Sequence, residues 1–127
     1  MNKEDIIKNL NLIRDTLDQK IPVGDIDGIE GKMMELCSMM GLSAECLAEA
    51  NMQLSVKQGE AIRHIRAKEP SINATLLKLT LESELAYQRM TCDYAERLNK
   101  AISHNCDSLR TAISKYKTEL TTSILGK

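Results

Sequence analysis

The feature that most constrains the fold is a repeat of apolar residues between positions 74 and 124, a stretch without proline or glycine. Apolar side chains recur there every eleven residues, in a leucine series and an isoleucine series. Eleven residues span three turns of about 3.67 residues each, so the stripe stays on one side of a nearly straight α-helix. The pattern predicts one long C-terminal helix over about residues 72–122. The two series are Leu98, Leu109 and Leu120, and Ile102, Ile113 and Ile124.

This helix is too long for the rest of the chain to cover. The repeat region forms a rod of roughly 75 Å at about 1.5 Å per residue, whereas a compact domain of 127 residues has a radius of gyration of only about 14 Å. Either the helix breaks, for example near Asn105, or other subunits cover its overhang, and we favour the second. The expected subunit contacts are Leu98, Ala101, Ile102, Leu109, Ala112, Ile113, Tyr116 and Leu120.

Three shorter helices are predicted before the long one. Asn2 can cap the first, Gly41 can end the second, and Pro70 ends the third. No segment shows the period-two alternation of a β-strand. The expected fold class is therefore all-α, a single domain over residues 1–127 that assembles into a helical-bundle oligomer. The shorter helices are expected over about residues 3–19, 28–40 and 44–68.

Composition argues against several classes of function. The chain has three tyrosines and no phenylalanine or tryptophan, too few rings to stack single-stranded bases. A net charge of −1 gives no general support to DNA binding. No apolar run approaches the roughly 18 residues of a membrane span, and residues 1–5 lack the apolar core of a signal peptide. We therefore expect a cytoplasmic protein with reduced cysteines and no membrane partner.

Charge is unevenly distributed along the chain. Residues 25–49 carry six carboxylates against one lysine, whereas residues 97–117 carry five basic side chains against one aspartate. Opposed segments of this kind can align subunits or attract an anion. They can equally be two solvated helix faces, because charge runs often mean no more than that.

No catalytic or metal-binding motif is present in the sequence. The four cysteines form no C-x-x-C pair, and Cys92 and Cys106 are about 21 Å apart along one helix. Neither His64 nor His104 has a cysteine three or four residues away on the same helix face. We therefore expect a protein that is not an enzyme and needs no metal or cofactor, with its thiols buried.

One polar cluster stands beside the apolar stripe of the long helix. On a helical wheel, five side chains share one shoulder, which we call the cationic flank, and Asn105 lies within the stripe itself. A buried asparagine can fix the register and number of partner helices, which is the interpretation that we favour. Alternatively, the region binds a small phosphate-bearing ligand, with Arg110 and a tyrosine contributing. The cationic flank consists of Arg97, His104, Ser108, Thr111 and Lys115.

Residues 68–120 contain the segments on which a resemblance to known proteins is based. The segment from Arg97 to Lys115, RLNKAISHNCDSLRTAISK, is followed by Lys117 and Glu119, and Glu69-Pro70-Ser71-Ile72 precedes it. Together they resemble a region of small helical proteins encoded by bacteriophages. The resemblance implies a phage protein acting in the cytoplasm of a bacterial host, and it transfers no functional residue.

This setting suggests two functions. The first is counter-defence, in which the oligomer sequesters a nucleotide signalling molecule or blocks a host defence protein. The alternative is a structural or accessory protein of phage DNA metabolism that contacts nucleic acid through its basic C-terminal helix. Salt distinguishes them, because binding to a nucleic-acid polymer weakens steeply as salt rises.

Overall fold

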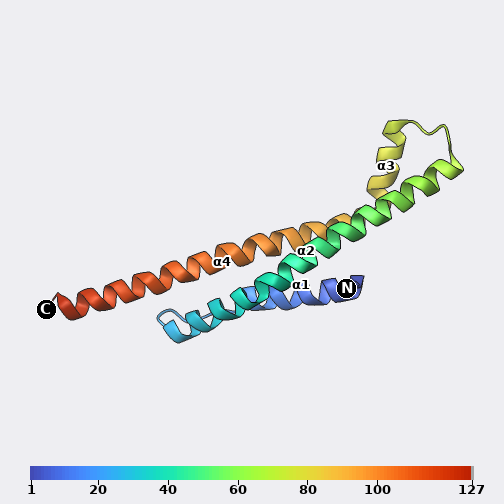
Figure 1. Ribbon diagram of the computed structural model, residues 1–127. Helices are drawn as coiled ribbons and strands as arrows, with labels where there is room; N and C mark the ends of the chain where they lie inside the picture. Colours follow the sequence, from blue (N-terminus) through green and yellow to red (C-terminus); the bar gives the residue numbers. More distant parts are fainter. Residues whose placement is uncertain (127) are drawn as a thin grey trace.

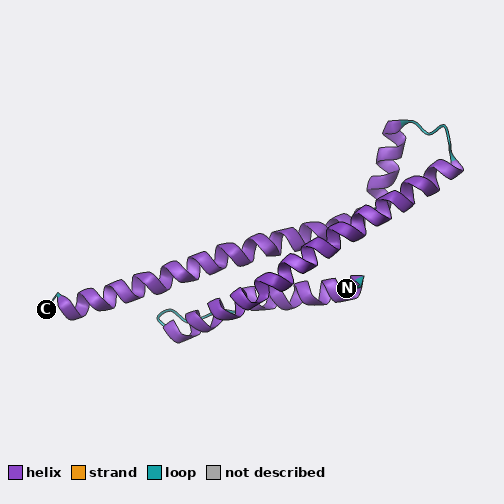
Figure 2. Cartoon of the chain, viewed as in Figure 1, coloured by secondary structure: helices purple, strands orange, loops and turns teal. Residues whose placement is uncertain are grey.

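The computed structural model describes residues 1–126, which form four helices and no strand (Figures 1 and 2). The predicted all-α class is confirmed. The two longest helices, α2 and α4, lie side by side and run in opposite directions, while α1 packs against both. The short helix α3 sits at the end of the molecule where α2 stops (Figure 1). The helices are α1 Lys3–Asp18, α2 Ile26–Lys68, α3 Ala74–Glu84 and α4 Ala86–Leu125.

The second and third predicted helices are one continuous helix, so the predicted break at Gly41 is wrong. Gly41 continues the helix at an exposed position, with nothing near the place of an added Cβ. Ser43, two residues further on, is buried within the helix, and its hydroxyl donates to Asn99 Oδ1 of α4 at 3.2 Å. The core-facing stripe runs through this point, from Leu36 to Ala50. Packing against α4 therefore outweighs the roughly 1 kcal/mol that a glycine costs a helix.

The long C-terminal helix is divided at Leu85 and not near Asn105. Leu85 has φ −99° and ψ 8°, which ends α3 before α4 begins. Its side chain is only 2% exposed and belongs to a small apolar cluster with Ile65 and Leu81. The break thus lets α3 turn back over the end of α2 and bury Leu81. The prediction of three short helices and one long one is corrected to two long helices, of 43 and 40 residues.

The main core lies where α1, α2 and α4 meet. α1 begins with a capping box in which Asn2 and Asp5 bond reciprocally, and it ends where Lys32 of α2 donates to the carbonyls of Leu17 and Gln19. α1 is therefore tied at both ends. The buried members of this core are Ile6, Leu10, Ile13, Leu36, Cys46, Ala50, Cys92, Ala95, Leu98, Ile102 and Cys106.

Candidate functional site

Two contacts between α2 and α4 define where α4 runs free of the rest of the chain. Cys37 lies beside Cys106, and Ser43 lies beside Asn99. Because the helices are antiparallel, Ile26 at the start of α2 lies opposite about residue 117 of α4. The last turns of α4 therefore project beyond α2, as Figure 1 shows. We call residues 116–125 the exposed α4 end.

The apolar stripe of α4 continues into the exposed α4 end. Ile113 is buried, and Leu120, seven residues later on the same helix face, is 49% exposed. Ile124 follows one turn further and is 68% exposed. Tyr116 lies on the same face and is also exposed. The face that builds the core of the chain is thus presented to solvent for about three turns.

The residues predicted to form subunit contacts divide into two groups. Leu98, Ile102 and Ile113 are buried within the chain itself, so the structure corrects the prediction at these three positions. The reason is that α2 is long enough to cover α4 up to about residue 117. The other five predicted contact positions remain at least partly accessible to solvent. Ala101 and Leu109 are half-buried, and Ala112, Tyr116 and Leu120 are exposed.

The residues of the cationic flank do not converge on one site. All five are exposed along α4, and Arg97 and Lys115 are separated by about 27 Å of helix. Arg97 lines a groove of 440 Å³ between α1 and α4, together with Ile7 and Tyr94. Thr111 donates its hydroxyl hydrogen to the carbonyl of Asp107. One small ligand can therefore contact only part of the flank on a single chain.

Arg110 and Asn105 are engaged within α4. The guanidinium of Arg110 forms an exposed ion pair with Asp107 at 3.2 Å. Asn105 is half-buried, and its Nδ2 donates to the carbonyl of Ala101 at 2.9 Å. The asparagine therefore meets its own helix in this chain, without interrupting α4. Its predicted role in fixing partner number stays a prediction.

The two oppositely charged segments are neighbours in the fold. The acidic residues 25–49 lie on α2 and its N-cap, and the basic residues 97–117 lie on the part of α4 that runs beside them. Within residues 1–126, no ion pair joins a side chain of α2 to one of α4. The opposite net charges of the two segments therefore favour the antiparallel packing of α2 and α4 through long-range attraction and not through individual ion pairs.

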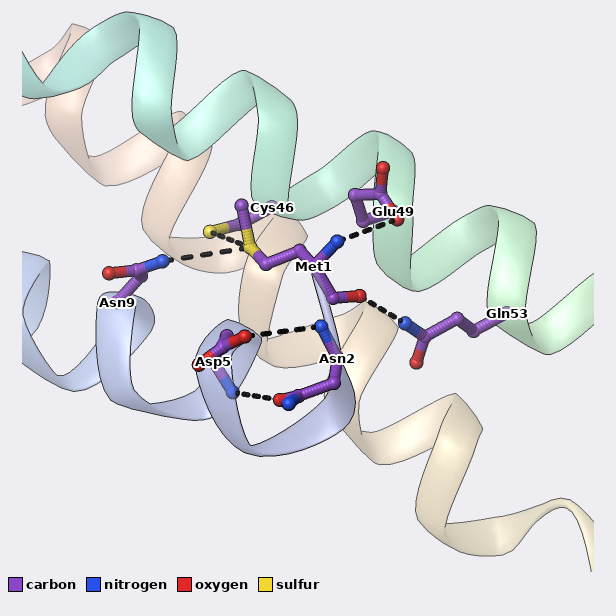
Figure 3. A network of polar contacts seen from close by, with 7 residues as sticks. All are labelled: Met1, Asn2, Asp5, Asn9, Cys46, Glu49 and Gln53. Atoms are coloured by element: carbon purple, nitrogen blue, oxygen red, sulfur yellow. Dashed lines mark hydrogen bonds and ion pairs between the residues drawn. The ribbon is translucent and has the colours of Figure 1, made fainter.

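The first residue anchors the start of α1 onto α2 (Figure 3). The amino group of Met1 lies 4.0 Å from a carboxylate oxygen of Glu49. Its carbonyl accepts a hydrogen bond of 3.0 Å from Gln53 Nε2, and its sulfur lies 3.9 Å from Cys46 Sγ. Asn9 also reaches this sulfur. We interpret this arrangement as structural, because each of its polar groups contacts another group of the same chain and together they hold the start of α1 against α2.

A pair of cysteines is the feature that the sequence did not reveal. Cys37 Sγ on α2 lies 3.6 Å from Cys106 Sγ on α4. Burial first, and then the hydrogen bond with Cys37, raise the pKa of Cys106 to about 11. Spacing along a single helix separates Cys92 from Cys106 and does not indicate this pair. The pair can be recognised only from the antiparallel register of α2 and α4, and that register is known only once the fold is known.

The part of the chain that the structure describes contains no cluster of three or more His, Cys, Asp or Glu side chains suited to a metal ion. None of its helices is both long and apolar enough to cross a lipid bilayer. No protein-family model, curated protein or solved structure matches the chain. The resemblance to phage proteins therefore stays an expectation from the sequence.

Proposed function

We propose that this protein is a non-enzymatic helical binding protein that acts as a homo-oligomer, assembled through the exposed α4 end. The observation that supports the proposal is the continuation of the core stripe into solvent at Leu120 and Ile124. Burial of apolar surface is worth about 25 cal/mol per Å². A contiguous apolar face that the chain leaves uncovered is typical of an interaction site.

A second copy of the chain is the partner that fits this surface. The face is aliphatic with one tyrosine, and Lys117 and Glu119 flank it, so two identical faces can meet without an excess of one charge. Opposite charges on one chain can also attract a second copy, because Lys115 and Lys117 on α4 are complementary to Asp25 and Asp27 at the start of α2. This complementarity favours a second copy over an unrelated acidic protein.

Light scattering tests the oligomer directly. At micromolar concentration we expect a particle whose mass is a multiple of the chain mass of 14.2 kDa. A monomer over the whole micromolar range contradicts the proposal. Native mass spectrometry of the particle purified from a bacterial lysate adds the subunit count and any retained small molecule.

For the ligand, we propose a small phosphate-bearing molecule held at the cationic flank. On one chain His104, Ser108 and Thr111 lie on successive turns of α4 and are exposed, so their donors are accessible to an anion. The remaining donors then come from Lys115 or from the second chain. A nucleotide signal sequestered in this way is a counter-defence activity of the kind that the phage resemblance suggests, and blocking of a host defence protein is the related possibility.

Calorimetry separates the ligand proposal from its alternative. We expect a panel of cyclic nucleotides and ADP-ribose derivatives to include a molecule that binds with fixed stoichiometry and is released unchanged. His104→Ala should weaken that binding, while His64→Ala, an exposed histidine on α2, should not. Heat only from nucleic-acid polymers, with affinity falling steeply as salt rises, supports a role in phage DNA metabolism. Absence of heat from every nucleotide makes a protein partner the better interpretation.

A further inference from the structure

Two cysteines that are far apart in the sequence meet across the two long helices. Cys37 Sγ and Cys106 Sγ are 3.6 Å apart, and the pair differs sharply in environment. Cys37 is exposed, whereas Cys106 is 1% exposed in the main core. We propose that this pair is an oxidation-sensitive site that closes to an intramolecular disulfide and ties α2 to α4. The inference does not depend on the proposed function.

The geometry requires only a small movement. A disulfide has an S–S bond of about 2.05 Å, so the two sulfur atoms must approach by roughly 1.5 Å. Cys37 lies at the surface, where its side chain has room to turn, while Cys106 is enclosed. The hydrogen bond between Ser43 and Asn99, about two turns away, holds the two helices in the same register. The two sulfur atoms can therefore reach bonding distance without rearrangement of the fold.

The chemistry is balanced with hydrogen peroxide as the oxidant. The thiolate of Cys37 attacks one peroxide oxygen, the O–O bond breaks, and a sulfenic acid forms on Cys37 as water is released. The sulfur of Cys106 then attacks Cys37 Sγ, which forms the S–S bond and breaks the S–O bond. The hydroxyl leaves as a second water with the proton of Cys106. Two thiols lose two electrons, and one peroxide molecule is reduced to two waters.

The environment sets the order of these steps. Because burial raises the pKa of Cys106 to about 11, this thiol stays protonated at neutral pH and does not react first. Burial likewise raises the pKa of Cys46 and of Cys92. Cys37 is the one exposed cysteine among the described residues. It therefore meets the oxidant, and Cys106 is the thiol within reach to resolve it.

The disulfide should stabilise the fold measurably. It closes a loop spanning 69 positions that contains most of α2, all of α3 and the first half of α4. Cross-linking a loop of this size restricts the unfolded chain. After allowance for strain in the bond, we expect the melting temperature to rise by about 5–15 °C on oxidation.

The test uses the full chain, fully reduced and then treated with one equivalent of hydrogen peroxide. We expect the mass to fall by two hydrogens, two of the four thiols to resist alkylation in denaturant, and a proteolytic map to link Cys37 to Cys106. A Cys46→Ala/Cys92→Ala variant should still form the bond. Cys37→Ser should abolish it and, because position 37 is exposed, should keep the reduced protein's circular dichroism spectrum.

Three outcomes overturn the proposal. The first is the survival of four free thiols after peroxide treatment. The second is the accumulation of sulfinic acid on Cys37 while Cys106 stays alkylatable. The third is a Cys37–Cys37 link between two chains in place of the internal bond. Each of them is distinguishable by mass spectrometry of the same sample, and none depends on a nucleotide ligand.

Discussion

Ser43 on α2 donates its hydroxyl hydrogen to the side-chain oxygen of Asn99 on α4, across a distance of 3.2 Å. Ser43 is fully buried, so the bond fixes which residues of the two long helices lie opposite each other. Cys37 and Cys106 meet in the same register. That register also determines how much of α4 extends past α2, which is the basis of the proposed function.

Ser43→Ala should therefore destabilise the packing of α2 against α4. The amide oxygen of Asn99 loses its donor, and we expect the free energy of unfolding to fall by about 1–2 kcal/mol. Urea unfolding measures the loss. Ser38→Ala is the matched control, because the Ser38 hydroxyl is exposed and donates to Glu35 of its own helix. Equal effects of the two substitutions would show that the bond between the helices has no special weight.

Replacing Gly41 by alanine tests whether α2 is continuous. At this position an added Cβ meets nothing within 4 Å, and Gly41 is inside a helix of 43 residues. Alanine should therefore raise the free energy of unfolding by about 0.5–1 kcal/mol. If the chain ended a helix at Gly41 in the left-handed conformation, as the sequence suggested, the same substitution would destabilise it. The sign of the change, measured by urea unfolding, decides between the two.

The sequence predicted the elements better than their boundaries. The eleven-residue stripe correctly indicated a long helix through Leu98 and Leu109, because a helix is read from its own periodicity. It did not reveal the turn at Leu85, where the gain comes from packing on Ile65 and has no proline or glycine to mark it. Gly41 misled in the opposite direction, since contacts of neighbouring residues with α4 keep the helix intact.

The candidate site was predicted in part for the same reason. The exposure of Tyr116 and Leu120 could be predicted, because the apolar stripe of the C-terminal helix is longer than the rest of the chain can cover. The cysteine pair and the burial of Ile102 depend on the register of two helices that are far apart in sequence. One sequence read along a single helix carries no information about that register.

Stability should fall in alkaline solution because of Cys106. The folded chain holds this proton up to a pKa of about 11, against an ordinary value of 9.0 in the unfolded chain. Above pH 9 the unfolded chain loses the proton first, so the free energy of unfolding declines between about pH 9 and 11, by up to about 3 kcal/mol. The contribution is fully present below pH 9. Around the thiol, Cys37 of α2 and Asp107 raise this pKa, while Arg110 lowers it.

Urea unfolding in reductant across this pH range measures the effect. The wild type is compared with Cys106→Ala, because all other groups that titrate at alkaline pH are present in both proteins. We expect the variant to be less stable at neutral pH but to lose less stability between pH 9 and 11. Parallel curves for the two proteins would contradict the assignment.

Leu120→Glu should disrupt the proposed oligomer without unfolding the chain. Leu120 is 49% exposed and has no role in the core, so the circular dichroism spectrum should be unchanged. Burying a carboxylate between two chains is costly, and we expect the dissociation constant of the oligomer to rise about tenfold or more. Leu79→Glu is the control, because Leu79 is also exposed, at 58%, but lies on α3, away from the exposed α4 end. Similar masses for the two variants in light scattering would argue against this surface.

Hydrogen exchange of the exposed α4 end tests the central claim most directly. Nothing within the described residues 1–126 covers residues 116–125, so their protection should come from a second copy and should increase with protein concentration. We predict rapid exchange of this segment at nanomolar concentration and slow exchange at tens of micromolar, while amides near Leu98 stay protected at both. Exchange in residues 116–125 that is equally fast at every concentration would contradict the account.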